Sequence, residues 1–470
     1  MHPVVERSGT AQVVALAALL LAAAPAHAQR PGAPRDPDSV VMTFAGDVAW
    51  PEGRPDMGRI RKSSDGLFAQ VKGLLERSDL AFANIECPMT AREPVAQKVY
   101  PFRCAPDILD WILAAGFNML SLANNHARDA GEAGIVDTIE LLERTTREDA
   151  PIFWAGTGRT AADARTPALF TVPGKNLRVA FFAVANSGGG MVDSLWDKGL
   201  PGRIGDASRN ADVVIVSSHG GPEYEHTPTA DFARRYRELI DAGATLIVGH
   251  HPHVIQGVER HGDGFIFYSL GNFSFGSITR RHLQTGARLY SLLARVKFRD
   301  KKLYRVELVP LYANNGARWT LGDRTVEPRM AVPQLLTGKF AQYALDDLEA
   351  FNRAVPGAKS TELVRLGDRL YSDVGGGNCN GDKAREVLLG RQASDWEAVI
   401  AAGAEPRAAT AAEKASRTRA GTPGRAEPPA PAPRARGKDR LAGGKPARPG
   451  KPKARATKAG RPVPSRQTRD

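Results

Sequence analysis

The chain repeats one pattern of hydrophobic and polar positions: a short apolar run, a polar or glycine-rich turn, and then a stretch with helical spacing. The apolar runs cover residues 40–45, 80–83, 119–122, 178–182, 213–216 and 245–248. Helical spacing occurs at 65–78, 106–115, 134–144 and 229–242. Unbroken apolar runs of this length are typical of strands buried on both faces. Their alternation with helices predicts an α/β layered fold.

Polar side chains with metal-binding chemistry stand just beyond the ends of five of these predicted strands. They are Asp47, Glu86, Asn125, His219 and the pair His251 and His253. Open α/β sheets build ligand sites at such strand ends. Singly, residues of these types are more often turn formers, helix caps or satisfied core residues. Together, carboxylate, amide and imidazole groups form a ligand set for one or two divalent ions such as Mn²⁺, Fe²⁺ or Zn²⁺.

The spacing of His251 and His253 predicts that both side chains face the ions. Alternate side chains of an extended segment point the same way, and Pro252 between them stiffens that conformation. We therefore expect His250 to point elsewhere. The ligand set contains no cysteine, which argues against a closed structural zinc site.

Six motifs occur in a fixed order along the chain. They are GD at 46–47, NIE at 84–86, ANNHARDAG at 123–131, HGGPEY at 219–224, GHHPH at 249–253 and YSLGNF at 268–273. Over roughly residues 38–285 this series resembles the CapA family of capsule and poly-γ-glutamate synthesis proteins. That family is part of the calcineurin-like metallophosphoesterase superfamily.

The resemblance implies a four-layer α/β/β/α metallophosphatase-like fold with the metal site at the strand ends. It makes Asp47 the first-strand carboxylate and puts Glu86 in the place of the superfamily's bridging aspartate. The remaining ligands that it implies are Asn125, His219, His251 and His253. One departure is that Ala49 stands where the superfamily's Asp-x-His motif has its histidine. The first metal site is therefore weaker, mononuclear, or completed by another residue.

The resemblance also implies that His126 contacts phosphate and acts as the general acid. Asp129, three residues on, either orients the His126 ring or is a helix N-terminal charge that interacts with the helix dipole. The candidates for substrate contacts are Asn84, Glu223 and Tyr224. Asn272 is equally a turn former or a ligand.

The net charge of +13 belongs to the C-terminal region rather than to the body of the chain. Residues 411–470 hold 17 Lys and Arg against 4 Asp and Glu, and the rest of the chain is balanced. The composition therefore argues against a basic nucleic-acid-binding domain, and we expect no nucleic acid partner. From residue 404 the chain is rich in Ala, Pro, Gly, Arg and Lys and has no aromatic residue, which predicts disorder. This tail either attracts an anionic polymer or is solvated without a dedicated partner.

Residues 1–28 are typical of a secretory signal peptide. An apolar run at 13–24 is followed by the cleavage motif Ala26-His27-Ala28, which predicts a mature chain that starts near Gln29, in the periplasm or outside the cell. Disulfides form in such oxidising compartments. Either Cys87 and Cys104 pair there, or all three cysteines stay as buried thiols.

The predicted organisation is a signal peptide (1–28), a CapA-like domain (38–320), a helical extension (321–403) and the basic tail (404–470). The extension rests on helical spacing at 330–351, 360–371 and 383–400.

The resemblance implies an exported protein with a metal-dependent phosphoesterase-type site. It would act with capsule-synthesis membrane proteins in the synthesis or export of an anionic polymer, poly-γ-glutamate by resemblance, or on a phosphorylated substrate. The alternatives are a non-catalytic polymer-binding assembly or export factor that retains the metal site, and a hydrolase or transferase that acts on polymer amide ends.

Overall fold

The computed structural model describes most of the predicted domain and part of the extension. The described residues are 39–53, 57–62, 66–275, 289–313, 318–327, 329, 331–359 and 361–374. The predicted signal peptide, the stretch 383–400, Cys379 and the basic tail lie outside them. Within these ranges no helix combines the length and the apolar composition that a membrane span needs.

The strands and helices follow the predicted alternation. The strands are β1 (Ser39–Ala49), β2 (Leu80–Ile85), β3 (Met119–Ser121), β4 (Phe153–Ala155), β5 (Ala168–Thr171), β6 (Arg178–Ala185), β7 (Val213–His219), β8 (Leu246–His250), β9 (Val258–His261), β10 (Gly264–Phe267), β11 (Asn272–Phe275), β12 (Tyr290–Arg299), β13 (Lys302–Tyr312), β14 (Trp319–Leu321), β15 (Arg324–Val326), β16 (Gln334–Leu335), β17 (Val364–Leu366) and β18 (Arg369–Asp373). The helices are α1 (Met57–Lys62), α2 (Ala69–Leu75), α3 (Ile108–Ala115), α4 (Gly131–Thr145), α5 (Ala161–Arg165), α6 (Leu200–Ser208), α7 (Ala230–Asp241) and α9 (Gly338–Ala354). Every predicted strand is present, and so are the four helices predicted before residue 245.

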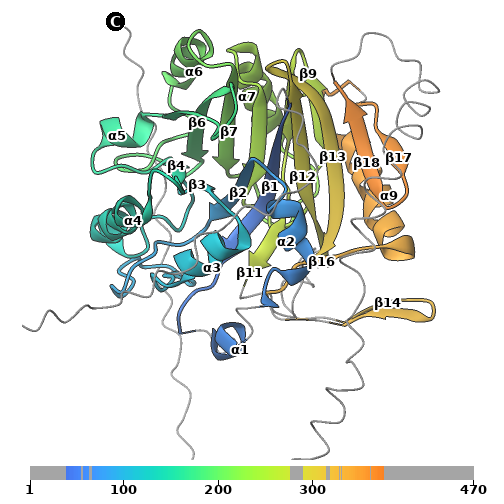
Figure 1. Ribbon diagram of the computed structural model, residues 1–470, viewed down its shortest axis with the longest axis horizontal. Helices are drawn as coiled ribbons and strands as arrows, with labels where there is room; N and C mark the ends of the chain where they lie inside the picture. The colour runs from blue at the N-terminus through green and yellow to red at the C-terminus, as the bar shows by residue number, and fades with distance from the viewer. Residues whose placement is uncertain are drawn as a thin grey trace, which may run out of the picture. The chain divides into compact units, whose positions relative to one another are not determined.

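Most strands belong to two large sheets. The ten-stranded sheet has the order β17-β18-β13-β12-β1-β2-β3-β4, with β11 beside β1 and β16 beside β13. The six-stranded sheet has the order β5-β6-β7-β8-β10-β9. Figure 1 shows the two sheets with helices on their outer sides. The strands that carry the predicted ligands, β1 and β2 in one sheet and β7 and β8 in the other, lie well inside the sheets rather than at their edges.

Three apolar clusters confirm the four-layer α/β/β/α arrangement. The inner cluster lies between the sheets, where alternate residues such as Phe44 and Phe82 of one sheet face Phe181 and Phe265 of the other. One outer cluster packs α2 and α3 on the ten-stranded sheet. The other packs α6 and α7 on the six-stranded sheet. Because both faces of the central strands are buried, their sequences read as unbroken apolar runs.

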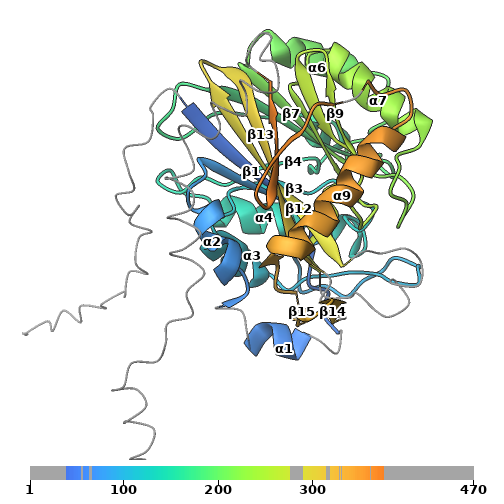
Figure 2. The same ribbon diagram turned by 90° about the vertical axis from the view of Figure 1, so that its right-hand side faces the viewer.

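The region after residue 320 is not a separate helical appendage. Helix α9 overlaps the helical stretch predicted at 330–351 and ends three residues after it. It places Phe340 and Leu345 in the inner cluster and runs beside both sheets (Figure 2). The helix predicted at 360–371 is wrong, because β17 and β18 form a hairpin that pairs with β13. A two-residue turn with Gly367 at φ +53° closes this hairpin. Glycine accepts that conformation without strain, which favours a turn over a continuous helix.

Candidate metal site

The two sheets bring their strand ends together at one edge. β1 and β2 run parallel, with Asp47 opposite Asn84, and β7 and β8 run parallel, with His219 opposite His250. The backbone N–H of His251 donates to Asp47 Oδ2 at 3.2 Å, which joins the sheets at this edge. The polar residues predicted at separate strand ends therefore form one cluster.

Glycines next to this cluster let chain segments pass unusually close to each other. A Cβ atom on Gly46 would lie 1.8 Å from the backbone O of Gly271, and one on Gly249 would lie 1.9 Å from the backbone O of Tyr268. Only glycine fits such a gap. The close approach allows the Asp47 N–H to donate to Gly271 O at 3.0 Å, which anchors the end of β1 beside the site.

Glu86 lies at the centre of the cluster. Its Oε1 is 3.5 Å from His219 Nε2, 3.8 Å from His253 Nε2 and 3.9 Å from His126 Nε2. The side chain is fully buried, and neither carboxylate oxygen has a hydrogen-bond partner among the described residues. Burial raises the pKa of Glu86 to about 8. A buried carboxylate without donors is costly unless a cation balances it, so Glu86 has the environment of a metal ligand.

Asp47 is held by neighbours from both sheets. Its Oδ1 accepts a hydrogen bond from Asn84 Nδ2 at 2.8 Å, and its Oδ2 lies 3.5 Å from His253 Nδ1. Burial alone raises the pKa of Asp47, but the nearby imidazoles of His250 and His253 outweigh it and hold the pKa well below its usual value. Asn84, predicted to contact substrate, is fully buried and its Nδ2 lies 3.1 Å from His219 Nδ1. In this structure its amide contacts two candidate ligands.

His219, His251 and Asn125 form a second part of the cluster. His219 Nε2 lies 2.8 Å from Asn125 Oδ1 and 3.1 Å from His251 Nδ1. Burial lowers the pKa of His219 and of His251 well below the usual value for histidine. Both imidazoles are therefore neutral at physiological pH, which is the form that binds metal.

The segment His251-Pro252-His253 is bent, so the predicted extended conformation is wrong. His251 has φ +94° and His253 has φ +59°, and the Tyr224 N–H donates to Pro252 O at 2.8 Å. The bend still turns both imidazoles toward the cluster. Burial alone lowers the pKa of His253, but the charges of Glu86 and Asp47 outweigh it and raise the pKa to about 10.

His250 does not point away from the site, contrary to the prediction. It continues the inward-facing series of β8, and its ring stacks on Phe82 between the sheets with centroids 5.4 Å apart. Its Nδ1 lies 3.4 Å from Asp47 Oδ1. The alternation along β8 was the signal for this position, since Leu246 and Val248 also face the inner cluster.

Three further polar residues adjoin the histidines. Glu223 is exposed, and one of its carboxylate oxygens lies within 4.8 Å of ligand atoms of His251 and His253. The sequence predicts Glu223 as a substrate contact. Its position would also allow it to supply the ligand that is missing from the first metal site, where Ala49 replaces the histidine of the Asp-x-His motif. The Tyr224 ring centroid is 6.0 Å from that of His253. Asn272 Oδ1 lies 2.9 Å from His253 Nδ1, so the side chain contacts a candidate ligand, which is neither of the two roles predicted for it.

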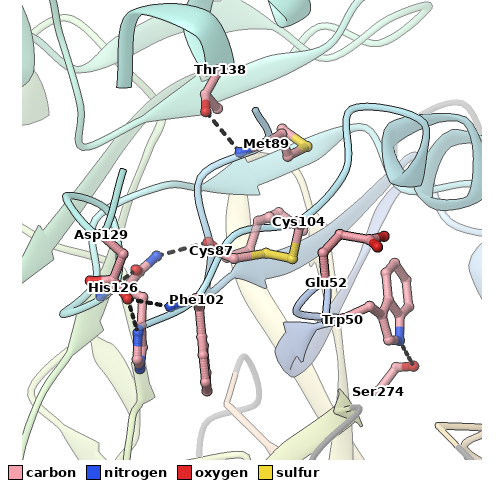
Figure 3. The surroundings of a disulfide bond; sticks show 12 residues. Trp50, Glu52, Cys87, Met89, Phe102, Cys104, His126, Asp129, Thr138 and Ser274 are labelled. Atoms are coloured by element: carbon pink, nitrogen blue, oxygen red, sulfur yellow. Dashed lines mark hydrogen bonds and ion pairs between the residues drawn. A yellow bond between two sulfur atoms is a disulfide. The ribbon is translucent and has the colours of Figure 1, made fainter. Parts of the chain in front are cut away.

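His126 and Asp129 form a buried pair beside the cluster. His126 Nδ1 lies 2.6 Å from Asp129 Oδ2, and His126 Nε2 faces Glu86. Asp129 precedes α4 and also accepts a hydrogen bond from the Phe102 N–H at 2.6 Å (Figure 3). The geometry favours the orienting role of Asp129 over a contact with the helix dipole, because the carboxylate is turned to the imidazole.

Cys87 and Cys104 form a disulfide, with Cα atoms 5.8 Å apart. The bridge lies directly after Glu86 and two residues after Phe102 (Figure 3). Both cysteines are buried. The pairing is thus confirmed over the alternative of free thiols, and it closes a loop whose ends adjoin the cluster of candidate ligands.

The donor set fits a divalent ion. Ligand atoms lie within 4.8 Å of one another in three groups, which are Glu86, His219 and His251; Asp47, Glu86 and His253; and Glu223, His251 and His253. Mixed oxygen and nitrogen donors suit Mn²⁺, Fe²⁺ or Zn²⁺. Glu86, whose oxygens lack hydrogen-bond donors, belongs to two of the groups.

Known proteins match a large part of the chain. The chain is 29% identical over 302 residues to "Capsule biosynthesis protein CapA" of Bacillus anthracis, which covers 60% of this chain and 70% of that protein. It is 31% identical over 254 residues to "PGA biosynthesis protein CapA" of Bacillus subtilis, which covers 51% of this chain and 64% of that protein. A solved structure described as a novel phosphatase from Mycoplasma pneumoniae is 16% identical with a TM-score of 0.38, over 58% of this chain and 93% of its own. That likeness is too distant to bear on the site.

Residues 41–277 match the family described as bacterial capsule synthesis protein PGA_cap. The matched residues make up half of the chain and contain every candidate ligand described above. The chain belongs to this family of bacterial capsule synthesis proteins.

Proposed function

We propose that this protein acts in the synthesis or export of a capsule-like anionic polymer, and that its strand-end cluster is a divalent-metal site of phosphoesterase type. One observation carries the proposal: the fully buried Glu86 carboxylate has no hydrogen-bond donor and lies among three imidazole nitrogens at 3.5–3.9 Å. Such a group is stabilised by a cation. The name of the Bacillus subtilis relative, a PGA biosynthesis protein, supports poly-γ-glutamate as the polymer.

The residues that would hold the metal come from both sheets. They are Asp47, Glu86, Asn125, His219, His251 and His253, with Glu223 at the open side. A divalent ion bound there would lower the pKa of water and polarise a phosphoryl oxygen. Asn84 and Asn272 would orient Asp47, His219 and His253 through the hydrogen bonds described above.

His126 would supply the proton to the leaving oxygen. Its Nδ1 is committed to Asp129, so Nε2 is the atom that faces the reacting groups. Asp129 holds the ring in this orientation and stabilises the imidazolium that donates from Nε2. Glu223 and Tyr224 adjoin the histidines from a loop that is at least partly exposed, where they would meet the substrate.

Metal analysis and turnover test this proposal directly. We expect the purified mature protein to contain bound metal, to lose it to a chelator, and to hydrolyse phosphate mono- or diesters when Mn²⁺ is restored. The readouts are elemental analysis and release of alcohol or phosphate. If the protein contains no bound metal and hydrolyses no phosphoester after addition of Mn²⁺, Fe²⁺ or Zn²⁺, the proposed phosphoesterase function is wrong.

A second candidate is a non-catalytic assembly or export factor that keeps the metal for binding polymer. The relatives' names, which describe biosynthesis rather than hydrolysis, favour it. Substitution His126→Ala separates the two, because His126 is not among the groups of ligand atoms. A catalyst should lose about 10²–10⁴-fold in kcat while it keeps its metal, whereas polymer output that persists in cells with His126→Ala would support the assembly role.

We also propose that the protein works after export. The disulfide between Cys87 and Cys104 supports this, because such bonds persist in oxidising compartments and are rare in the cytosol. Cell fractionation, with detection of the processed and unprocessed chain lengths, tests it. Recovery of only the full-length chain in the cytosol would contradict export.

A further inference from the structure

The loop between β2 and α3 packs against the metal cluster but contributes none of its predicted ligands. It spans residues 88–103 and is closed at its base by the disulfide between Cys87 and Cys104. Its inner contacts converge on one short turn, residues 124–130, which carries the metal ligand Asn125 and the pair His126 and Asp129.

Lys98 joins the two sides of this turn. Its Nζ lies 2.5 Å from Asp129 Oδ1 and donates to the backbone O of Asn125 at 2.9 Å. The Asp129 side chain is almost fully buried, so its bonds to a charged donor are strong. Lys98 thus contacts the residue before His126 and the carboxylate that orients His126.

Phe102 holds the same pair from a second direction. Its backbone N–H donates to Asp129 Oδ2 at 2.6 Å, the oxygen that also binds His126 Nδ1. Its ring stacks on the His126 imidazole with centroids 3.8 Å apart and planes 9° apart (Figure 3). A flat stack at this distance leaves the imidazole little freedom to rotate away from Asp129.

The loop backbone completes the contact. The N–H groups of Val95 and Ala96 donate to the backbone O of Asp129 at 2.7 and 3.1 Å. The base of the loop is tied to α4, where the Met89 N–H donates to Thr138 Oγ1 at 2.9 Å. Asp129 therefore receives hydrogen bonds or an ion pair from four residues of this loop, through both its side chain and its backbone.

We propose that the disulfide-closed loop 88–103 positions the proton donor. Lys98 and Phe102 are positioning residues that hold the Asp129 carboxylate against the His126 ring. This inference rests on the proposed function for its catalytic consequence, but the contacts that it assigns can be tested without turnover. The loop fixes the orientation of the His126 ring. Among the candidate metal ligands, the contacts of this loop described above reach only Asn125.

Proton donation matters most for poor leaving groups. The ratio of kcat values for a poor and a good leaving group therefore reports on proton donation, and a general loss of stability would not change this ratio. An alkyl alcohol leaves as an alkoxide unless it is protonated, whereas 4-nitrophenolate leaves readily without a proton. A displaced His126 should therefore lower kcat for an alkyl phosphoester more than kcat for the matching 4-nitrophenyl ester. A folding defect lowers both equally.

The experiment compares Lys98→Met and Phe102→Leu with a control on the same loop. Arg103→Met removes one cation and an ion pair to the exposed Glu93, and it leaves Asp129 untouched. We expect Lys98→Met and Phe102→Leu to lower the alkyl to 4-nitrophenyl ratio of kcat at least about tenfold, Lys98→Arg to restore it in part, and Arg103→Met to leave it unchanged. An unchanged ratio in both Lys98→Met and Phe102→Leu would overturn the proposal.

Hydrogen exchange followed by mass spectrometry tests the positioning alone. Peptides that cover residues 124–131 should exchange faster in Lys98→Met than in Arg103→Met, while peptides from β7 and β8 should not differ. If the wild-type protein turns over no phosphoester, the proposed function fails and the exchange result still decides the positioning role. Equal exchange of this turn in the two variants would refute it.

Discussion

Loss of the disulfide between Cys87 and Cys104 is the perturbation whose energy follows most directly from the structure. The bridge joins residues 17 apart. In the chain-entropy treatment, cross-linking a loop of this length restricts the unfolded chain by about 3 kcal/mol. Two backbone bonds keep the folded loop in place without the bridge, since Cys104 N donates to Pro88 O and Thr90 N donates to Cys104 O. The effect therefore falls mainly on the unfolded state.

The variant Cys87→Ala/Cys104→Ala should thus fold and lose about 3 kcal/mol of unfolding free energy. Alanine is preferred to serine because both positions are buried, and a hydroxyl there would lack a partner. Urea unfolding followed by tryptophan fluorescence measures the loss. For a denaturant slope of about 3 kcal/mol per molar, the midpoint falls by about 1 M.

Reductant gives the matched control. Dithiothreitol should lower the wild-type midpoint to that of the double-alanine variant and should leave the variant where it is, even though the variant retains Cys379. A loss below about 1 kcal/mol would refute the entropic reasoning. So would an equal response of both proteins to the reductant.

Three further outcomes follow from the site and the tail. Glu86→Gln should abolish metal binding in titration calorimetry, whereas Glu132→Gln, exposed on α4, should bind as wild type does; equal affinities would contradict the ligand role. Gly46→Ala should lower the yield of folded protein or its metal content because its Cβ meets a backbone oxygen at 1.8 Å, while Gly202→Ala, with open space around it, should not; a fully loaded, stable Gly46→Ala would exclude this. Removal of residues 405–470 should weaken binding to poly-γ-glutamate and flatten its salt dependence without changing turnover of a small phosphoester, and unchanged retention of the polymer would favour a tail without a partner.

The layered fold and the identity of the clustered residues were predictable because strands buried on both faces have unbroken apolar sequences. Strands such as β7 and β8 are covered on both faces, so they appear as apolar runs, and their polar ends mark the sheet edge. Asp47 and Glu86 could be expected to meet for this reason. The structure explains why residues 46 and 249 are glycines, because a neighbouring backbone occupies the space that a side chain would need.

The remaining features depend on contacts that a periodicity does not contain. The bend at His251 and His253 arises from bonds to Asp47 and Tyr224, which are distant in sequence. Apolar residues at 360–371 fit a helical spacing as well as a hairpin, and pairing with β13 decides between them. The role of Lys98 likewise gave no sequence signal, because a lysine in a polar loop is typical of solvent-exposed positions.

The strand that carries Asp47 has a neighbour from outside the part of the chain that matches the family. β1 pairs with β12, and β12 pairs with β13, both after residue 277. A truncated protein that ends at residue 277 would therefore expose an open edge along β1. One that ends at residue 320 would keep β12 and β13 but would lack α9, which uncovers apolar residues of the inner cluster. Open edges of this kind promote aggregation. The minimal unit for recombinant expression of this candidate metal site therefore extends through β18, to residue 374.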